Sequence, residues 1–237
     1  VMLFIMLIFV PAILLETGLI PRGWTWPVML SPSAAATEAL NYAAKTTGDL
    51  PKAAAGLAYL GLLAGYETID AVVGDDVLRG ELHRLAVDEI AATLPFVGGA
   101  AASAAPDEVV DGVLGRFSNA SLGHRCAQIA ADGSQKLGPR ILATAAIRHR
   151  NGDPSDGLAT VVAAWVSLVE SATRRGTALN DPLGPRLLDA AAEPGDSDRV
   201  RRLLGLLAAT DDMLGGLLDD SAFVDSVLAG RRRLGVG

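Results

Sequence analysis

The chain has 237 residues, enough for one large domain or two small ones with a substantial core. Half of the residues are hydrophobic but only 5% are aromatic, and because the apolar residues are mostly Ala, Leu and Val, the composition favours helices. The net charge of −7 argues against nucleic acid as a partner, and the single cysteine, Cys126, excludes an internal disulfide and fits the reducing cytoplasm.

The N-terminal part differs from the rest. Residues 1–15 are an unbroken apolar run that Glu16 ends before the roughly 20 residues of a membrane span. Residues 21–36 are rich in Pro and Trp and resemble a linker. Three interpretations stay open for residues 1–36: a membrane anchor formed by residues 1–20, a signal segment, or sequence that is not native to the domain. We favour the third, and we expect the helical domain to cover residues 37–237.

Beyond residue 36 the pattern is helical, with breaks where Gly, Pro and Asp cluster. The segment at 53–73 is apolar on nearly all sides, which predicts a buried helix. Asp75 or Asp76 is expected to cap the next helix, at about 76–93. Further helices are expected at about 107–117, 121–131, 139–150, 156–175, 183–192, 197–209 and 219–230.

Several kinds of active site have no counterpart in the sequence. No strand–helix–strand alternation is present, and neither a G-x-G-x-x-G turn nor a phosphate-binding loop occurs. A dinucleotide site of the usual strand–turn–helix kind is therefore not expected. The three histidines lie far apart without ligand spacing, so we predict no metal site.

Residues 115–140 carry the strongest functional signal. They read GRFSNASLGHRCAQIAADGSQKLGPR and closely resemble a signature of the mannitol dehydrogenase and hexuronate reductase family. Two flanking pieces agree in order and spacing: the helix segment LAYLG at 57–61, and the turn Asp181-Pro182-Leu183. The resemblance covers roughly residues 53–230, which correspond to the family's C-terminal domain.

The resemblance implies a fold and a function. The fold would be an all-α, multi-helix domain of the 6-phosphogluconate dehydrogenase C-terminal type, without a Rossmann domain. The family's enzymes interconvert sugar alcohols or hexuronates with keto sugars and use NAD. We therefore expect a polyol or hexuronate as the small-molecule partner.

The same stretch contains the candidate substrate-binding residues. Gln128 and Asp132 are four apart, which would place them on one helix face, and Lys136 is expected on the turn that follows. An amide and an ammonium at a helix–helix corner can hydrogen-bond the hydroxyls of a linear sugar. Alternatively, Asp132 and Ser134 only cap helix ends and Lys136 is solvated. His124 and Arg125 are further candidates, although structural hydrogen bonding explains His124 equally well.

The catalytic motif of the family is not matched. Its lysine acts as the general base, and an asparagine and a histidine orient the base and polarise the oxyanion. Alignment on the LAYLG segment puts Thr46, Pro51 and Ala54 at these three positions. One inserted residue brings Lys45 to the lysine position, as the only catalytic candidate, still without its partners.

We therefore expect the chain to be inactive as a dehydrogenase by itself and to contain no NAD site. Two alternatives remain open. A split enzyme would receive its Rossmann domain from a separate chain, and it would expose an apolar face on the helix at 53–73. A non-enzymatic helical protein would keep the fold for binding or assembly, with residues 1–20 as a membrane tether.

Overall fold

The computed structural model describes residues 54–93, 106–208, 212–219 and 221–235, all of which belong to the compact unit Asp49–Gly237. All regular elements among the described residues are helices, and the only β-type pairing among these residues is an isolated bridge between Thr68 and Arg125. The predicted all-α fold is therefore confirmed. Lys45, the apolar run 1–15 and the boundary expected after residue 36 all lie outside the described residues.

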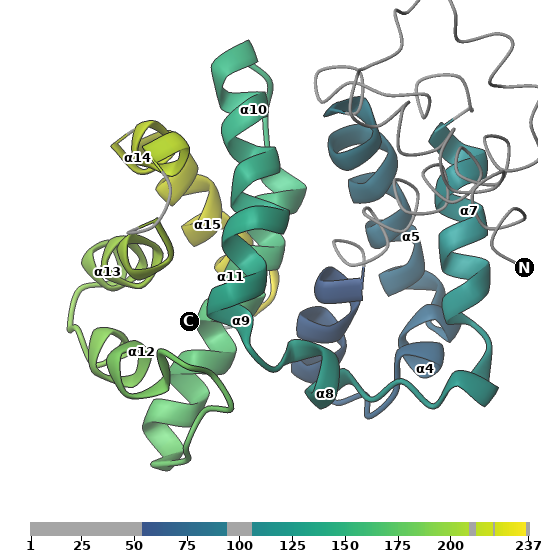
Figure 1. The fold of residues 1–237 in the computed structure, drawn as a ribbon, viewed down its shortest axis with the longest axis horizontal. Coiled ribbons are helices and arrows are strands. Elements are labelled where there is room, and N and C mark those ends of the chain that lie inside the picture. Colours follow the sequence, from purple (N-terminus) through teal and green to yellow (C-terminus); the bar gives the residue numbers. More distant parts are fainter. Residues whose placement is uncertain (1–53, 94–105, 209–211, 220, 236–237) are drawn as a thin grey trace, which may run out of the picture. The chain divides into compact units, whose positions relative to one another are not determined.

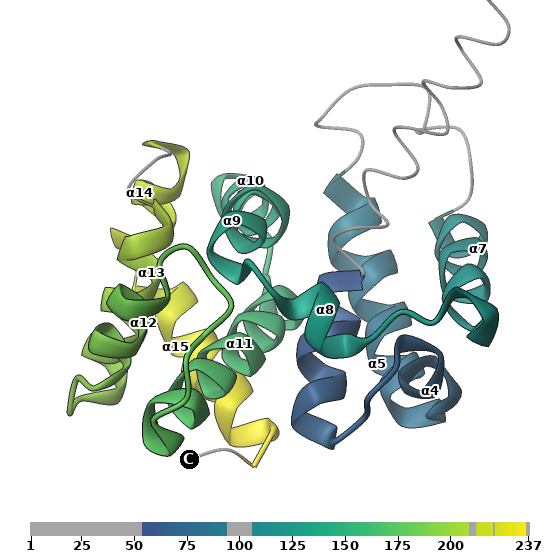
Figure 2. The ribbon, with the colours of Figure 1, turned by 60° about the horizontal axis from the view of Figure 1, so that its bottom comes forward.

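The helices form two groups on either side of a central set (Figures 1 and 2). The first group contains residues 54–64, α4 (Ile69–Gly74), α5 (Asp76–Leu85) with its continuations η2 (Ala86–Ile90) and η3 (Ala91–Thr93), and α7 (Pro106–Phe117). The short turn η5 (Ala120–Leu122) follows α7 on the side of this first group. The central set contains α8 (Cys126–Ala130), α9 (Gly133–Leu137), η6 (Gly138–Leu142), α10 (Ala143–Asn151) and α11 (Asp156–Arg175). The last group contains α12 (Gly184–Ala191), α13 (Asp196–Ala208), α14 (Asp212–Asp219) and α15 (Ser221–Arg233).

The long helix α11 is the centre of the core. Its middle, from Val161 to Val166, is buried on all sides, and it packs chiefly against α15 and α12. The approach of α15 is close, since a Cβ added at Gly230 would lie 3.0 Å from the Cα of Thr160. A helix that is apolar all round is expected at such a position.

Polar contacts hold α13 and α15 against α11. Glu170, on α11 and only 5% exposed, accepts a hydrogen bond from Arg231 of α15 at 2.8 Å and from Arg199 of α13 at 2.9 Å. At the other end of α11, both oxygens of Glu89 accept from the backbone N–H groups of Gly157 and Leu158, at 2.6 and 2.8 Å. A carboxylate from η2 thus satisfies free donors at the N-terminus of α11.

The predicted helix at 53–73 is interrupted. Residues 54–64 form one helix, Gly65 adopts a positive φ of 87°, and α4 begins at Ile69. The apolar runs on either side hid this break, although the polar residues Glu67 and Thr68 stand between Gly65 and α4. Residues 54–61 are buried, so the exposed apolar face expected for a split enzyme is not seen on them.

Other boundaries agree more closely with the pattern. Asp75 caps α5, accepting from the N–H groups of Val77 and Leu78 at 2.9 and 3.0 Å, which decides between the two expected capping residues. Helix α14 was not expected, and α9 occupies what was predicted to be a turn. No helix within the described residues is both long and apolar enough to cross a membrane.

Candidate functional site

The corner between α8 and α9 contains most of the predicted site. Helix α8 ends at Ala130, and Asp132 then takes a left-handed conformation with φ 56° and ψ 38° before α9 begins. Aspartate adopts this conformation more readily than most residues. The N–H of Asp132 donates to the carbonyl of Asn180 at 2.9 Å, so a distant turn supports the left-handed residue.

That turn also supplies the capping carboxylate of α9. Asp181 accepts from the N–H and the hydroxyl of Ser134, at 2.7 and 2.6 Å, and from the N–H of Leu183 at 2.8 Å. The side chain of Asp132 makes no capping hydrogen bond. The side chain that caps α9 is therefore that of Asp181 and not, as suggested from the sequence, that of Asp132. Asp181 was expected in a turn but was not proposed as a site residue.

Lys136 lies within α9 rather than on a connecting turn. Its side chain is half-buried, and its ammonium donates to the carbonyls of Ile129 and Ala131, at 2.9 and 2.5 Å. These carbonyls stand at the end of α8, where a cation satisfies free acceptors and the negative end of the helix dipole. Two of the three N–H groups are accounted for, which leaves one for another acceptor.

The remaining candidates lie before and within α8. Gln128 is exposed on α8, but Asp132 falls beyond the end of that helix, so the two do not share a helix face as predicted. Arg125 is exposed and pairs with Thr68 in the single bridge. The carbonyl of His124 accepts from Ile69 at 2.9 Å, and its ring meets Phe117 edge to face at 6.3 Å.

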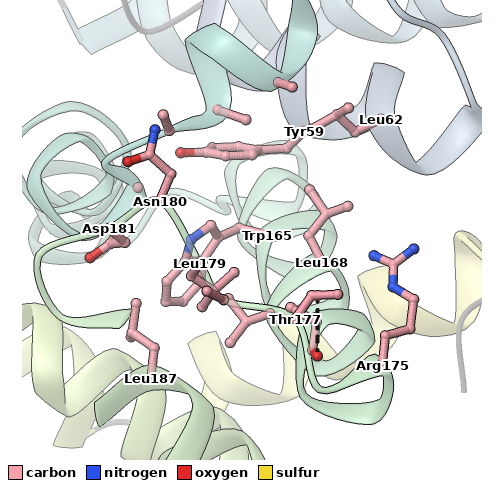
Figure 3. A pocket seen from close by; sticks show the side chains of 17 residues that line it. Tyr59, Leu62, Trp165, Leu168, Arg175, Thr177, Leu179, Asn180, Asp181 and Leu187 are labelled. Atoms are coloured by element: carbon pink, nitrogen blue, oxygen red, sulfur yellow. Dashed lines mark hydrogen bonds between the residues drawn. The ribbon is translucent and has the colours of Figure 1, made fainter. Parts of the chain in front are cut away.

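Next to this corner lies a pocket that the sequence did not predict (Figure 3). Its volume is about 230 Å³, and its wall on the corner side consists of small residues: Ala127, Ala130, Ala131 and Gly133. None of the five candidate side chains lines it. The small size of Gly133 is required here, because an added Cβ would lie 2.5 Å from Nε1 of Trp165 and 3.2 Å from the hydroxyl of Tyr59.

Tyr59 is the polar group buried most deeply in this wall. It is 1% exposed, and its hydroxyl makes no hydrogen bond. Burial, and secondly the negative charge of Asp181, hold the pKa of Tyr59 well above its usual range. The phenol therefore stays neutral and keeps its proton as a donor.

The described residues do not fit the cofactor that the family resemblance implies. Dinucleotides are bound at the end of a parallel strand, where a glycine-rich turn leads into a helix. Residues 54–93, 106–208, 212–219 and 221–235 contain an isolated bridge but no strand. In the same ranges, no three His, Cys, Asp or Glu side chains are grouped to hold a metal ion.

The fold and the corner together define an all-helical domain of the kind that forms the C-terminal part of polyol dehydrogenases. The model of the mannitol dehydrogenase C-terminal domain matches residues 50–232. The chain therefore belongs to the mannitol dehydrogenase family, as the signature at 115–140 indicated.

Individual relatives agree. D-mannonate oxidoreductase of Escherichia coli (strain K12) is 36% identical over 180 residues, which are 75% of this chain and 36% of that protein. Mannitol 2-dehydrogenase of Phaeosphaeria nodorum is 30% identical over 171 residues, 71% of this chain and 28% of the relative. This chain thus spans about a third of the length of the curated relatives that it matches.

A solved structure shares the fold. The crystal structure of D-sorbitol dehydrogenase in substrate-free form superposes with a TM-score of 0.62, covering 77% of this chain and 36% of that chain. The sequence identity is 20%, so this likeness supports the fold alone.

Proposed function

We propose that this chain provides the substrate-contacting helical domain of an NAD-dependent polyol dehydrogenase or hexuronate reductase. The observation that supports this most is the α8–α9 corner, where the family signature coincides with a supported, left-handed Asp132 and a lysine that retains a free N–H. A fold by itself does not define a function, so the proposal rests on this site.

The corner offers two groups that suit a linear sugar. Gln128 presents an amide to solvent on α8, and Lys136 has one donor beyond the two that hold the end of α8. Both can hydrogen-bond hydroxyl or carboxylate oxygens. Since relatives include a D-mannonate oxidoreductase and mannitol 2-dehydrogenases, the substrate is a sugar alcohol or a sugar acid.

Hydride transfer needs groups that the described residues do not supply. They form no dinucleotide site, and the family's Lys/Asn/His motif has no full counterpart near Lys45. We therefore assign NAD binding and proton transfer to a nucleotide-binding domain beyond the described residues. By itself, this chain is expected to bind substrate weakly and not to oxidise it.

Calorimetric titration of the purified chain with D-mannonate, fructuronate and mannitol, and separately with NADH, tests the proposal. We expect weak saturable binding of one sugar and none of NADH. Gln128→Ala should weaken sugar binding about threefold to tenfold, the net value of one hydrogen bond. Gln135→Ala, on the exposed side of α9, is the matched control and should leave binding unchanged.

Two results would contradict the proposal. Saturable NADH binding would mean that the chain contains a nucleotide site after all. Binding of a sugar that is equally strong in the Gln128→Ala variant and in the Gln135→Ala control would place the substrate away from the α8–α9 corner.

A further inference from the structure

The pocket next to the α8–α9 corner has no part in the proposed function. Its volume of about 230 Å³ far exceeds the roughly 30 Å³ of a water molecule but lies below the usual range for drug-sized ligands, about 300–1,000 Å³. The side chains of Gln128 and Lys136 do not line it. It is therefore a separate space, of a size that suits a small organic molecule.

One end of the pocket has a polar group without a partner. The hydroxyl of Tyr59 is buried and makes no hydrogen bond, which costs free energy in the absence of a ligand. In Figure 3 this hydroxyl lies on the same side as Asn180 and Asp181. The carboxylate of Asp181 accepts from Ser134 and Leu183, and no hydrogen bond joins it to the phenol.

The other end carries a cation. Arg175, the last residue of α11, lines the pocket and is exposed, and Figure 3 shows it on the side opposite to the Tyr59 hydroxyl. Between the two ends lie Leu168 and the ring of Trp165, and Val169 also belongs to the largely apolar lining. A guanidinium at a pocket mouth binds carboxylates well, because it offers paired donors in one plane.

We propose that this pocket binds a small carboxylate with an apolar body and a hydroxyl or carbonyl oxygen at its far end. Arg175 binds the carboxylate, and the Tyr59 hydroxyl donates to the far oxygen. The apolar wall between them covers the body of the ligand. A polyol carries hydroxyls along its whole length and would leave them unpaired against Leu168 and Val169, so the pocket disfavours such a molecule.

The test uses two probes, 4-hydroxybenzoate and benzoate, titrated calorimetrically into the full chain. We expect saturable binding of 4-hydroxybenzoate. Arg175→Gln should weaken it about tenfold, the value of one charge-assisted hydrogen bond, whereas Arg174→Gln should leave it unchanged. Arg174 is the matched control, since it is adjacent, exposed and outside the lining.

Tyr59→Phe separates the far contact from general packing. This variant keeps the ring, so it should weaken 4-hydroxybenzoate binding about threefold to tenfold and leave benzoate unaffected. Circular dichroism checks that each variant is folded. Absence of saturable binding, equal effects of the two arginine variants, or equal losses for both probes in Tyr59→Phe would each overturn the proposal.

Discussion

Substitution of Glu170 by Gln is expected to destabilise this domain more than any surface charge change. Glu170 lies in the middle of the packed helices, 6% exposed in its side chain, and holds Arg231 at 2.8 Å and Arg199 at 2.9 Å. The two arginines come from α15 and α13, so one carboxylate joins three helices. Gln keeps the size of the side chain but removes the negative charge.

The size of the expected loss in stability follows from the ion pairs that Arg199 and Arg231 keep in the variant. Arg199 keeps Asp196 at 2.8 Å, whereas the guanidinium of Arg231, 7% exposed, keeps only the same Asp196 at 4.0 Å. Removal of one partner of a buried pair costs about 3–5 kcal/mol, and the lower end applies here because Arg199 stays paired. For a domain of this size, about 3 kcal/mol lowers the melting temperature by about 6–12 °C.

Urea and thermal unfolding followed by circular dichroism measure this difference. Asp189→Asn is the control, because it removes a carboxylate from Arg202 at 2.7 Å where both side chains are at least half exposed. Such exposed pairs contribute about 0–1 kcal/mol. If Glu170→Gln and Asp189→Asn lowered the free energy of unfolding equally, the reasoning from burial would be refuted.

Three further predictions concern the corner and the N-terminus of α11. Gly133→Ala should lower the free energy of unfolding by about 1–3 kcal/mol, because the new Cβ overlaps Trp165. Gly205→Ala, with open space around it, should stabilise α13 by up to about 1 kcal/mol. Urea unfolding compares the two variants, and equal effects would contradict the close approach of Gly133 to Trp165. Asp181→Asn should lower the free energy of unfolding by about 1.5–3 kcal/mol and weaken sugar binding by the corner, because the charge that caps α9 is lost. An unchanged free energy of unfolding would contradict the capping role of Asp181. Burial raises the pKa of Glu89 above its ordinary value of 4.5, so its contribution to stability is complete below that pH and is lost as pH rises through the folded-state pKa. The free energy of unfolding of Glu89→Gln should therefore rise relative to that of the wild type as the pH increases from 4.5. A difference between the two free energies that stays constant with pH would contradict the raised pKa.

The sequence predicted most of the fold because its helices have clear starts and stops. The 20-residue α11 appears within its predicted bounds, as its apolar residues lie between Pro154 and Gly176. The break at Gly65 was missed, because a single glycine inside a largely apolar segment is also tolerated within a helix. Helix α14 was missed as well, since two glycines and two leucines at its centre are equally consistent with a loop.

The geometry of the candidate site was predicted less well than the fold, for a different reason. The signature located the corner correctly along the chain, but hydrogen bonds to residues almost fifty positions away determine its geometry. Asp181 accepts hydrogen bonds from Ser134, which is 47 residues away in the sequence, and no local sequence pattern predicts such a contact. The pocket likewise arises where Tyr59, Trp165 and the loop at 176–181 meet, three segments that are far apart in the sequence.

Lys136 has a structural role as well as a proposed role in substrate binding, and this decides which substitution tests the corner. Its ammonium holds the end of α8, which carries Gln128, while α9 itself is held by Asp181. Loss of Lys136 would therefore displace Gln128 even if no substrate touched the lysine. Gln128 is the sharper probe, because it is exposed and its removal leaves the hydrogen bonds between α8, α9 and the 180–183 turn in place. A loss of sugar binding in Gln128→Ala at unchanged stability would thus report contact with the substrate, whereas the same loss in Lys136→Ala would not distinguish contact from support.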